Sequence, residues 1–225
     1  MILGRGLKPR ATSDLATAQN RRRLGRMFAR VQTTRFTRGR LPHWEVEGGR
    51  YFVTVRCHDS LPREVVARLQ EIQGSVHRVE PKSDEFVRLQ RQYFLTMEKF
   101  LDAGSGSAPL RRDEAAAALV AAFAALPDEG VSVPHFAIMP NHWHALLEPA
   151  GTESIDLRCV MTRLKGRTSR AVNLALGRSG TLWQREWFDR WMRDDAEWSR
   201  CVDYVRLNPV KAGLVRDWQE DPWTR

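Results

Sequence analysis

The sequence lacks long hydrophobic runs, and it contains only three cysteines. No apolar stretch approaches the length of about 18 residues that a membrane-spanning helix needs. The first residues do not lead into the apolar core of a secretory signal. Cys57, Cys159 and Cys201 stand at unrelated spacings, which form neither a disulfide framework nor a zinc ribbon. We therefore expect a protein of the reducing cytoplasm that makes no membrane contact.

Acidic residues are scarce near the N-terminus. Residues 1–40 hold eleven Lys and Arg against one acid, Asp14, whereas residues 41–225 hold 25 against 26. The net charge of +9 is thus concentrated in a basic arm. Such an arm suits a phosphate backbone, because each neutralised phosphate releases condensed counterions. A solvated extension without a partner and an organelle transit peptide are the alternatives.

The remaining residues are sufficient in number for one α/β domain with a buried core. We expect residues 1–45 to be a flexible basic extension and residues 46–220 to be a single domain. Alternating and β-branched apolar residues predict strands over 51–57, 131–139, 142–148 and 181–188. Apolar spacings of three and four residues predict helices over 61–73, 86–101, 113–126, 155–176 and 195–207.

Two histidines lie at the start of the expected strand over residues 142–148, which is otherwise largely apolar. Side chains two apart on a strand share a face, so His142 and His144 would stand side by side while Trp143 turns to the opposite face. Two neutral imidazoles with one further oxygen ligand and open positions describe a catalytic metal site. Mg²⁺ or Mn²⁺ suits phosphate chemistry, and Mn²⁺ and Zn²⁺ tolerate imidazole better. Taken alone, a His-x-His pair is more often incidental.

The chain has only three tyrosines, and Tyr204 alone has a metal-ligand candidate one helical turn later, Asn208. A phenolate is a competent nucleophile toward a phosphodiester, provided that a nearby cation lowers its pKa from about 10. The alternative is a helix tyrosine half buried against the sheet. Because Pro209 follows Asn208, we expect Asn208 at the fraying end of its helix.

Acids are absent from residues 157–185, which carry many cations. A basic helix with hydroxyl side chains beside a metal site suits a nucleic-acid backbone, although a solvated charged face is the alternative. Trp183 and Trp187 could stack on unpaired bases, but we favour core packing for both. The predicted nucleic-acid contacts are Arg158, Arg163, Lys165, Arg167, Arg170, Arg178, Arg185 and, after the tyrosine, Lys211.

Three motifs resemble those of a known family, the REP-associated tyrosine transposases, within the single-tyrosine transposases that carry a His-hydrophobic-His motif. The similarity extends over residues 51–215, and its most specific part begins at Tyr204. The motifs are Met139-Pro140-Asn141-His142-Trp143-His144, the block 177–186, and Tyr204 with Asn208-Pro209-Val210-Lys211-Ala212-Gly213-Leu214-Val215.

The resemblance implies a ferredoxin-like fold, an antiparallel sheet with helices packed on one face. It implies that His142, His144 and Asn208 hold a divalent ion and that Tyr204 attacks single-stranded DNA, which leaves a 5′-phosphotyrosine and a free 3′-OH. The implied substrates are REP-like palindromes that fold as hairpins with single-stranded flanks. Both a monomer and a homodimer with shared active sites fit the family.

The chain departs from the family pattern in two places. Trp187 stands where many relatives have a tyrosine, and the basic arm of residues 1–40 is longer than the family's. We therefore predict a metal-dependent single-stranded DNA endonuclease and strand transferase. A domesticated hairpin-binding protein that no longer transposes, and a metal-dependent phosphoesterase that uses water, are the alternatives.

Overall fold

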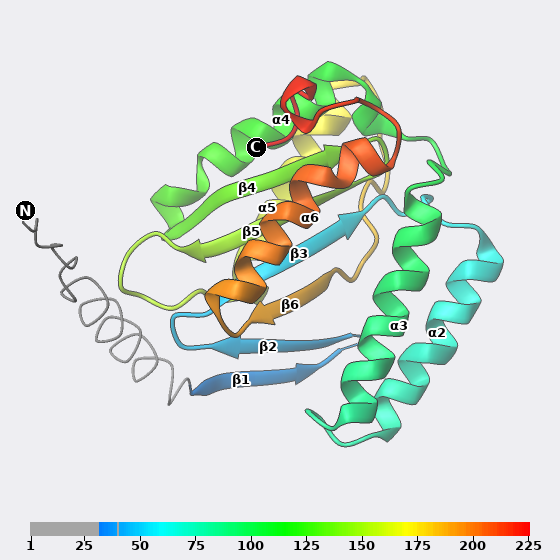
Figure 1. The fold of residues 1–225 in the computed structure, drawn as a ribbon. Helices are drawn as coiled ribbons and strands as arrows, with labels where there is room; N and C mark the ends of the chain where they lie inside the picture. Colours follow the sequence, from blue (N-terminus) through cyan, green and yellow to red (C-terminus); the bar gives the residue numbers. More distant parts are fainter. Residues whose placement is uncertain (1–31, 40) are drawn as a thin grey trace, which may run out of the picture. The chain divides into compact units, whose positions relative to one another are not determined.

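An antiparallel sheet of four strands forms the centre of the protein (Figure 1). The computed structural model describes residues 32–39 and 41–225. The sheet has the order β4-β5-β3-β6, and every neighbouring pair is antiparallel. Its strands are β3 (Arg50–Arg56), β4 (Val131–Met139), β5 (His142–Pro149) and β6 (Phe188–Met192).

The crossover helices complete a ferredoxin-like arrangement. Helix α4 (Asp113–Ala124) connects β3 to β4, and α5 (Leu157–Ala175) connects β5 to β6. In each connection the two strands are separated in the sheet by one other strand, which is the interleaved β-α-β pattern of this fold. The predicted α/β fold class with an antiparallel sheet is therefore confirmed.

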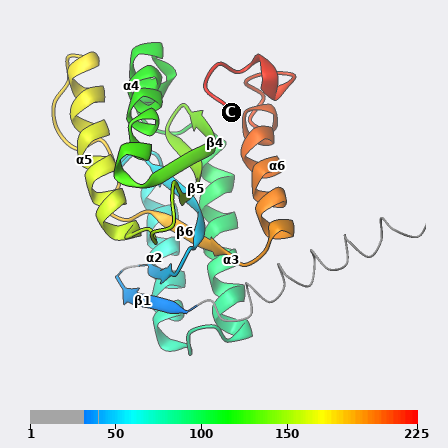
Figure 2. The same cartoon turned by 90° about the vertical axis from the view of Figure 1, so that its left-hand side faces the viewer.

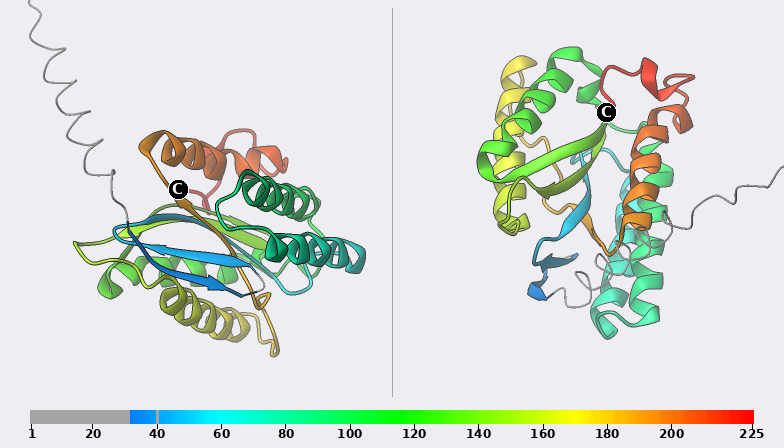
Figure 3. Two further views of the ribbon diagram at one scale, coloured as in Figure 1. Left: turned by 90° about the horizontal axis from the view of Figure 1, so that it is seen from below. Right: turned by 60° about the vertical axis from the view of Figure 1, so that its left-hand side comes forward.

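Helices cover both faces of the sheet, whereas the family resemblance implied one face (Figure 2, Figure 3). Helices α4 and α5 pack on the face that carries Val53 and Trp143. Helices α2 (Arg63–Arg78), α3 (Asp84–Leu101) and α6 (Asp195–Lys211) pack on the face that carries Phe52 and Leu146. The expected packing on one face is incomplete, because further helices cover the second face. Helices α2 and α3 form a hairpin between β3 and α4, and α6 follows β6.

The last strand begins later than predicted. Residues 181–187 were expected to open it, but β6 starts at Phe188. Trp183 lies in the core and donates from its indole Nε1 to the Thr168 hydroxyl at 3.0 Å. This tertiary contact, together with single backbone bonds such as Gln184 N to Arg56 O at 2.9 Å, holds the segment without a continuous ladder. The core role favoured for Trp183 is confirmed, and Trp187 is half buried and stacks on His43.

Helix α6 continues past Pro209, contrary to the expected end near residue 207. Proline cannot donate a backbone hydrogen bond, but the helix continues to Lys211, and Ala212 N caps it by donating to Asn208 O at 3.0 Å. Asn208 is consequently a buried residue inside a helix rather than part of a fraying end.

Residues 33–46 form a separate antiparallel pair, β1 (Thr33–Arg38) and β2 (Pro42–Val46), and cluster with the rest of residues 33–225. This part of the expected 1–45 extension therefore has regular structure. Most of the basic arm falls on residues 1–31, which lie outside the described residues, so its flexibility and its role stay predictions. Within the part of the chain that is described, no helix is long and apolar enough to cross a membrane.

The C-terminal residues lie along β4. Backbone bonds join Ile138 N to Trp223 O at 3.0 Å and Arg225 N to Phe136 O at 2.9 Å. Because β4 is at the edge of the sheet, these bonds use backbone groups that a strand neighbour would otherwise use.

A buried ion pair joins β2 to β6. The His43 Nδ1 atom contacts the Asp189 carboxylate, and its Nε2 atom lies 3.4 Å from Glu186 Oε2. Burial alone would lower the pKa of His43, but the charges of Asp189 and Glu186 and their hydrogen bonds raise it to about 9. The imidazole is therefore protonated in the folded protein at neutral pH.

The raised pKa of His43 makes stability depend on pH. Since the folded-state pKa is about 9 and the ordinary value is 6.5, the contribution is complete below pH 6.5 and is lost as the pH rises through about 9. We expect on the order of 2 kcal/mol of unfolding free energy to disappear over this interval. Urea unfolding at several pH values measures it. His43→Gln should flatten the curve in this window, and an equal slope in both proteins would contradict the assignment.

Candidate metal and nucleophile site

The two histidines are brought together by the pleat of β5. His142 and His144 are both fully buried, and their Nε2 atoms lie 3.1 Å apart. Two nitrogens that bind one ion at about 2.1 Å are separated by roughly 3.0–3.4 Å for bond angles between octahedral and tetrahedral values. Trp143, between them, points into the opposite core and contacts Phe123 of α4. The predicted division of the motif between the two faces is confirmed.

Each imidazole is oriented by a hydrogen bond at its other nitrogen. Thr54 on β3 bonds His144 Nδ1 at 2.8 Å, and the Asn141 side-chain oxygen accepts from His142 Nδ1 at 2.8 Å. A proton on His142 Nδ1 leaves its Nε2 lone pair free to bind an ion. Burial, and next the charge of His144, lower the pKa of His142 to about 3, so this ring is neutral.

Asn141 also fixes the loop that follows α3. Its amide nitrogen donates to Ser105 O at 2.9 Å and to Leu101 O at 3.4 Å. The Asn141 side chain thus joins the end of α3 to His142. This contact holds α3 in place beside the histidine pair.

Glu98 of α3 supplies a carboxylate that the sequence reasoning missed. Its Oε2 atom lies 3.4 Å from His144 Nε2 and accepts a hydrogen bond from the Tyr204 hydroxyl. Glu98, His142 and His144 each place a ligand atom within 4.8 Å of the others. Burial would raise the pKa of Glu98, but the charge and hydrogen bonding of His144, with smaller effects of His142 and Tyr204, hold it below its ordinary value.

A signal for Glu98 was present in the sequence. Phe94 and Leu101 lie four residues before and three residues after it, so the acid falls within the apolar side of a predicted helix. A carboxylate in such a position needs a partner when it is buried. What the sequence did not show was that the partner comes from β5.

Tyr204 of α6 lies beside the cluster. Its ring contacts His144 with centroids 5.5 Å apart and packs edge-on against Phe52 at 5.7 Å. The Lys211 ammonium lies 4.8 Å from the centre of the same ring. Burial, and then the charge and hydrogen bonding of Glu98, raise the pKa of Tyr204 above its ordinary value, and the side chain of Asn208 acts in the opposite direction.

The donor set fits a divalent ion. The Asn208 side-chain oxygen and the Glu98 Oε1 atom are buried and have no hydrogen-bond partner within residues 32–39 and 41–225. Buried oxygen atoms without a partner are costly, and an ion between the histidines would satisfy such atoms. His142 and His144 would hold the ion, with Glu98 or Asn208 as the oxygen ligand. Among the described residues, Glu98 is therefore an alternative to Asn208, the predicted third ligand.

The basic helix does not lie beside this site. Helix α5 lies on one side of the sheet, and α3 and α6 lie on the other (Figure 2). His144 contacts Glu98 of α3 and Tyr204 of α6. The expectation that α5 flanks the metal site is wrong, because a helix pattern does not indicate which face of the sheet receives it. Arg163 and Arg167 both pair with Glu129, whereas Arg158 and Arg170 are exposed.

The other predicted contacts have different surroundings. The Lys165 ammonium donates to the carbonyls of Gln184 at 2.7 Å and Arg185 at 2.5 Å, and burial lowers its pKa to about 8. It therefore holds the 181–187 segment in place. Arg178 is half buried and the Arg185 side chain is exposed, while Lys211 alone of the predicted cations contacts the nucleophile candidate.

Fold and site together define an antiparallel α/β protein in which two histidines and a carboxylate meet a helix-borne tyrosine. A protein of Haemophilus influenzae described as a REP-associated tyrosine transposase is 30% identical over an alignment of 94 residues, and the match covers 36% of this chain. The match covers 52% of that relative, so the chain spans about half the length of the curated protein it matches. No protein-family model matches. The resemblance predicted from the motifs is confirmed by this relative.

Solved structures, among them the following two, are also similar to the chain. A REP-associated tyrosine transposase bound to a REP hairpin has a TM-score of 0.45 and 17% identity, over 81% of this chain and 79% of that one. A Deinococcus radiodurans protein described as a transposase has a TM-score of 0.31 and 15% identity, over 76% of this chain and 97% of that one.

The Thr54 hydroxyl is expected to tune metal affinity without touching the ion. Thr54→Val keeps the shape of the side chain but removes the bond to His144 Nδ1. We expect Mn²⁺ affinity, measured by calorimetry, to fall about tenfold, since orienting partners of this kind typically contribute that much. The exposed Thr162→Val is the matched control. Equal Mn²⁺ affinity in the two variants would show that Thr54 does not orient a ligand.

Proposed function

We propose that the protein is a metal-dependent single-stranded DNA endonuclease and strand transferase, a REP-associated tyrosine transposase, that acts in the cytoplasm on hairpin or palindromic DNA. The observation that carries the proposal is the hydrogen bond from Tyr204 to Glu98, which lies against His144. It joins a nucleophile to a candidate metal cluster. The similarity to the Haemophilus influenzae protein supports the same activity.

The proposed reaction is a transfer of a phosphodiester to the phenol. The Tyr204 oxygen attacks phosphorus, its proton passes to the Glu98 carboxylate, and the bond to the 3′ oxygen breaks. The products are a 5′-phosphotyrosine and a 3′-OH, whose proton comes from solvent. Attack by that 3′-OH or another one on the phosphotyrosine reverses the step and joins strands.

The surroundings of Tyr204 determine when it can react. Without substrate the phenol is protonated, because burial and Glu98 raise its pKa. A divalent ion, Mg²⁺ or Mn²⁺, held by His142, His144 and an oxygen of Glu98 or Asn208, would supply positive charge that polarises the phosphate. Lys211, over the Tyr204 ring, adds a second positive charge near the phenolate as it forms.

The α5 surface is a candidate contact for the stem of a hairpin. Arg163, Arg167 and Arg170 line a groove on it together with Thr162 and Glu129. Arg158 lines a neighbouring groove, which Thr162 and Arg163 share. Because α5 and Tyr204 are on opposite faces of the sheet, this contact would be separate from the cleavage site. Arg178 and Arg185, in and beside the following loop, are proposed to extend it.

Tyr204→Phe is expected to abolish a covalent adduct. Protein, Mn²⁺ and hairpin DNA labelled at either end are incubated and separated on a denaturing gel. The adduct of the unchanged protein should carry the 3′ label, because the phosphotyrosine forms on the 5′ phosphate of the fragment that contains the 3′ end. The variant should form no adduct. Tyr51→Phe, which changes a tyrosine on the opposite face of the sheet, is the control. Cleavage without an adduct would indicate a water-using phosphoesterase, and a band shift without cleavage would indicate a domesticated DNA-binding protein.

Removing charge from α5 is expected to weaken binding more than chemistry. With Arg158→Gln and Arg170→Gln combined, the plot of log affinity against log salt should become less steep. The magnitude of its slope should fall by about 0.9 per lost duplex contact. The adduct rate at saturating DNA should stay near that of the unchanged protein. Arg88→Gln, which removes an arginine paired with Glu85 on α3, is the control. An unchanged salt slope would exclude these two arginines as contacts.

A further inference from the structure

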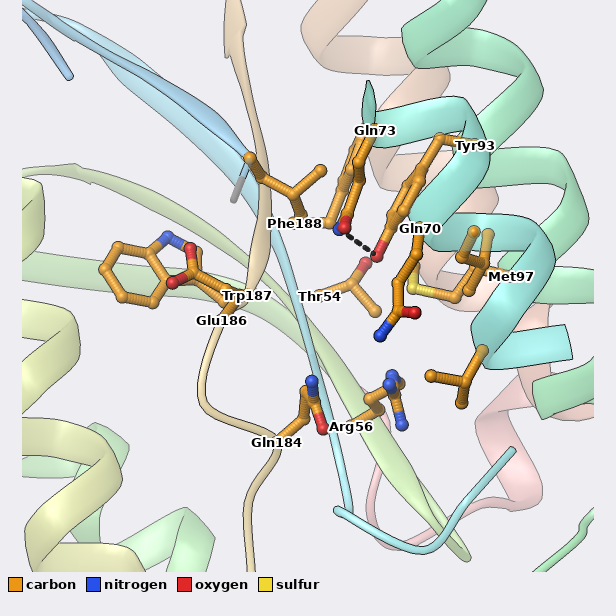
Figure 4. Close-up of a pocket in the computed structure, with 13 residues that line it drawn as sticks. Thr54, Arg56, Gln70, Gln73, Tyr93, Met97, Gln184, Glu186, Trp187 and Phe188 are labelled. Atoms are coloured by element: carbon orange, nitrogen blue, oxygen red, sulfur yellow. Dashed lines mark hydrogen bonds between the residues drawn. The ribbon is translucent and has the colours of Figure 1, made fainter. Parts of the chain in front are cut away.

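A small cavity is lined by Thr54 and Arg56 of β3 (Figure 4), whose direct partners in the β3–β5 ladder are His144 and His142. Its volume is about 30 Å³. Thr54, which bonds His144, lines it from β3, and residues of α2 and α3 close it on the other side. The polar side chains around it are those of Thr54, Arg56, Gln70, Gln73, Tyr93, Gln184 and Glu186.

Arg56 is a buried charge without a counter-ion. Only 6% of its surface is exposed, and no acidic side chain pairs with it among the described residues. Its Nη1 atom donates to Cys57 O and to Ser60 Oγ, each at 3.3 Å, which are long bonds. A guanidinium has five N–H donors and remains charged even where burial lowers its pKa. Most of its donors are therefore left for another acceptor.

The remaining polar groups leave this charge uncompensated. Gln73 donates to the Tyr93 hydroxyl at 3.3 Å, and Figure 4 shows the Gln70 amide turned toward the Arg56 guanidinium, with Gln184 on its other side. Glu186 is the one acid in the lining, and it is paired with His43 rather than with Arg56. Buried charges are normally paired or bound to a ligand of opposite sign.

The position of Arg56 relates the cavity to the reaction site. Arg56 is the direct partner of His142 in the β3–β5 ladder, as Thr54 is of His144. Side chains directly opposite on one face of an antiparallel pair have Cβ atoms about 5 Å apart. An anion bound by Arg56 would therefore be a neighbour of anything held between the two histidines.

We propose that this cavity binds a non-bridging phosphate oxygen of the DNA strand, at a phosphate next to the one that Tyr204 attacks. The inference rests on the proposed function for the identity of the strand. A phosphate group offers acceptors only, which suits a site where donors predominate. The cavity is too small for a nucleobase, whereas one phosphate oxygen is close to the size of a water molecule. Arg56 would thus fix the register of the strand on the enzyme.

The test measures binding rather than cleavage. All proteins carry Tyr204→Phe, divalent ions are absent, and affinity for a single-stranded oligonucleotide is followed by fluorescence anisotropy at several salt concentrations. Arg56→Gln should weaken binding about tenfold and reduce the magnitude of the salt slope by about 0.7, the value for one phosphate on a single strand. Arg56→Lys should keep the slope. Arg78→Gln, at the distant end of α2, is the control and should keep both affinity and slope.

A second measurement locates the phosphate. Oligonucleotides with one neutral methylphosphonate linkage at successive positions are compared for binding to the Tyr204→Phe protein. One position should weaken binding to this protein and have no further effect on the protein that also carries Arg56→Gln. If circular dichroism shows that Arg56→Gln does not fold, the comparison uses Arg56→Lys, in which the penalty at that position should be smaller.

An unchanged salt slope together with additive effects at every position would overturn the proposal. That result would make Arg56 a purely structural residue. Failure of the proposed function appears separately, as the absence of an adduct on unmodified DNA with Tyr204 intact. The phosphate-binding role of the cavity can therefore be rejected while the nuclease activity stands. The nuclease activity can equally be rejected while phosphate binding stands.

Discussion

The two-residue period of β5 is the constraint on which the site depends. Because successive side chains of a strand alternate between faces, His142 and His144 face α3 and α6 while Trp143 and Ala145 enter the core beneath α4 and α5. The large apolar residues on the second face prevent the strand from slipping by one position, since a slip would bury the imidazoles among them and move Trp143 to the face that carries Glu98 and Tyr204. The register that packs the core is thus the register that pairs the histidines.

The α2–α3 hairpin adds a second requirement to the ferredoxin-like framework. It covers a sheet face that the crossover helices leave open, and it brings Glu98 to the histidines. Its position is secured by Asn141, whose amide and carbonyl oxygen act on two different elements at once. A buried carboxylate, two imidazoles and a phenol are expensive to place together in a core, so their gathering indicates a function rather than a contribution to stability.

The sequence predicted much of this arrangement, and the errors have physical causes. The helix and strand periods located most of the elements to within a few residues, and the spacing of His142, His144, Tyr204 and Asn208 identified side chains that do converge. Glu98 was missed because its partner is far away along the chain, and local patterns carry no such pairing. Trp183 misled the strand assignment, since its aromatic character reflects burial against Thr168 rather than a ladder.

The sheet face on which α5 packs could not be predicted from its pattern of apolar residues, for a different reason. Amphipathicity shows that a helix has a buried side but not which sheet face lies beneath it, and that choice is made by the crossover that delivers it. The charge on its outer side was correctly seen, but its distance from the histidines follows only from topology. The charge of α5 could therefore be predicted from the sequence, whereas its distance from the histidines could not.

The bonding of residues 223–225 to β4 bears on how copies of the protein could meet. A free edge strand is a template on which another chain can add a strand, and proteins often protect such edges. Here Phe136 and Ile138 already have backbone partners in the same molecule. A dimer that extends this sheet continuously through β4 would first require that the terminal segment be displaced. Self-association without that rearrangement has to use other surfaces, such as helices, loops or the opposite edge of the sheet at β6.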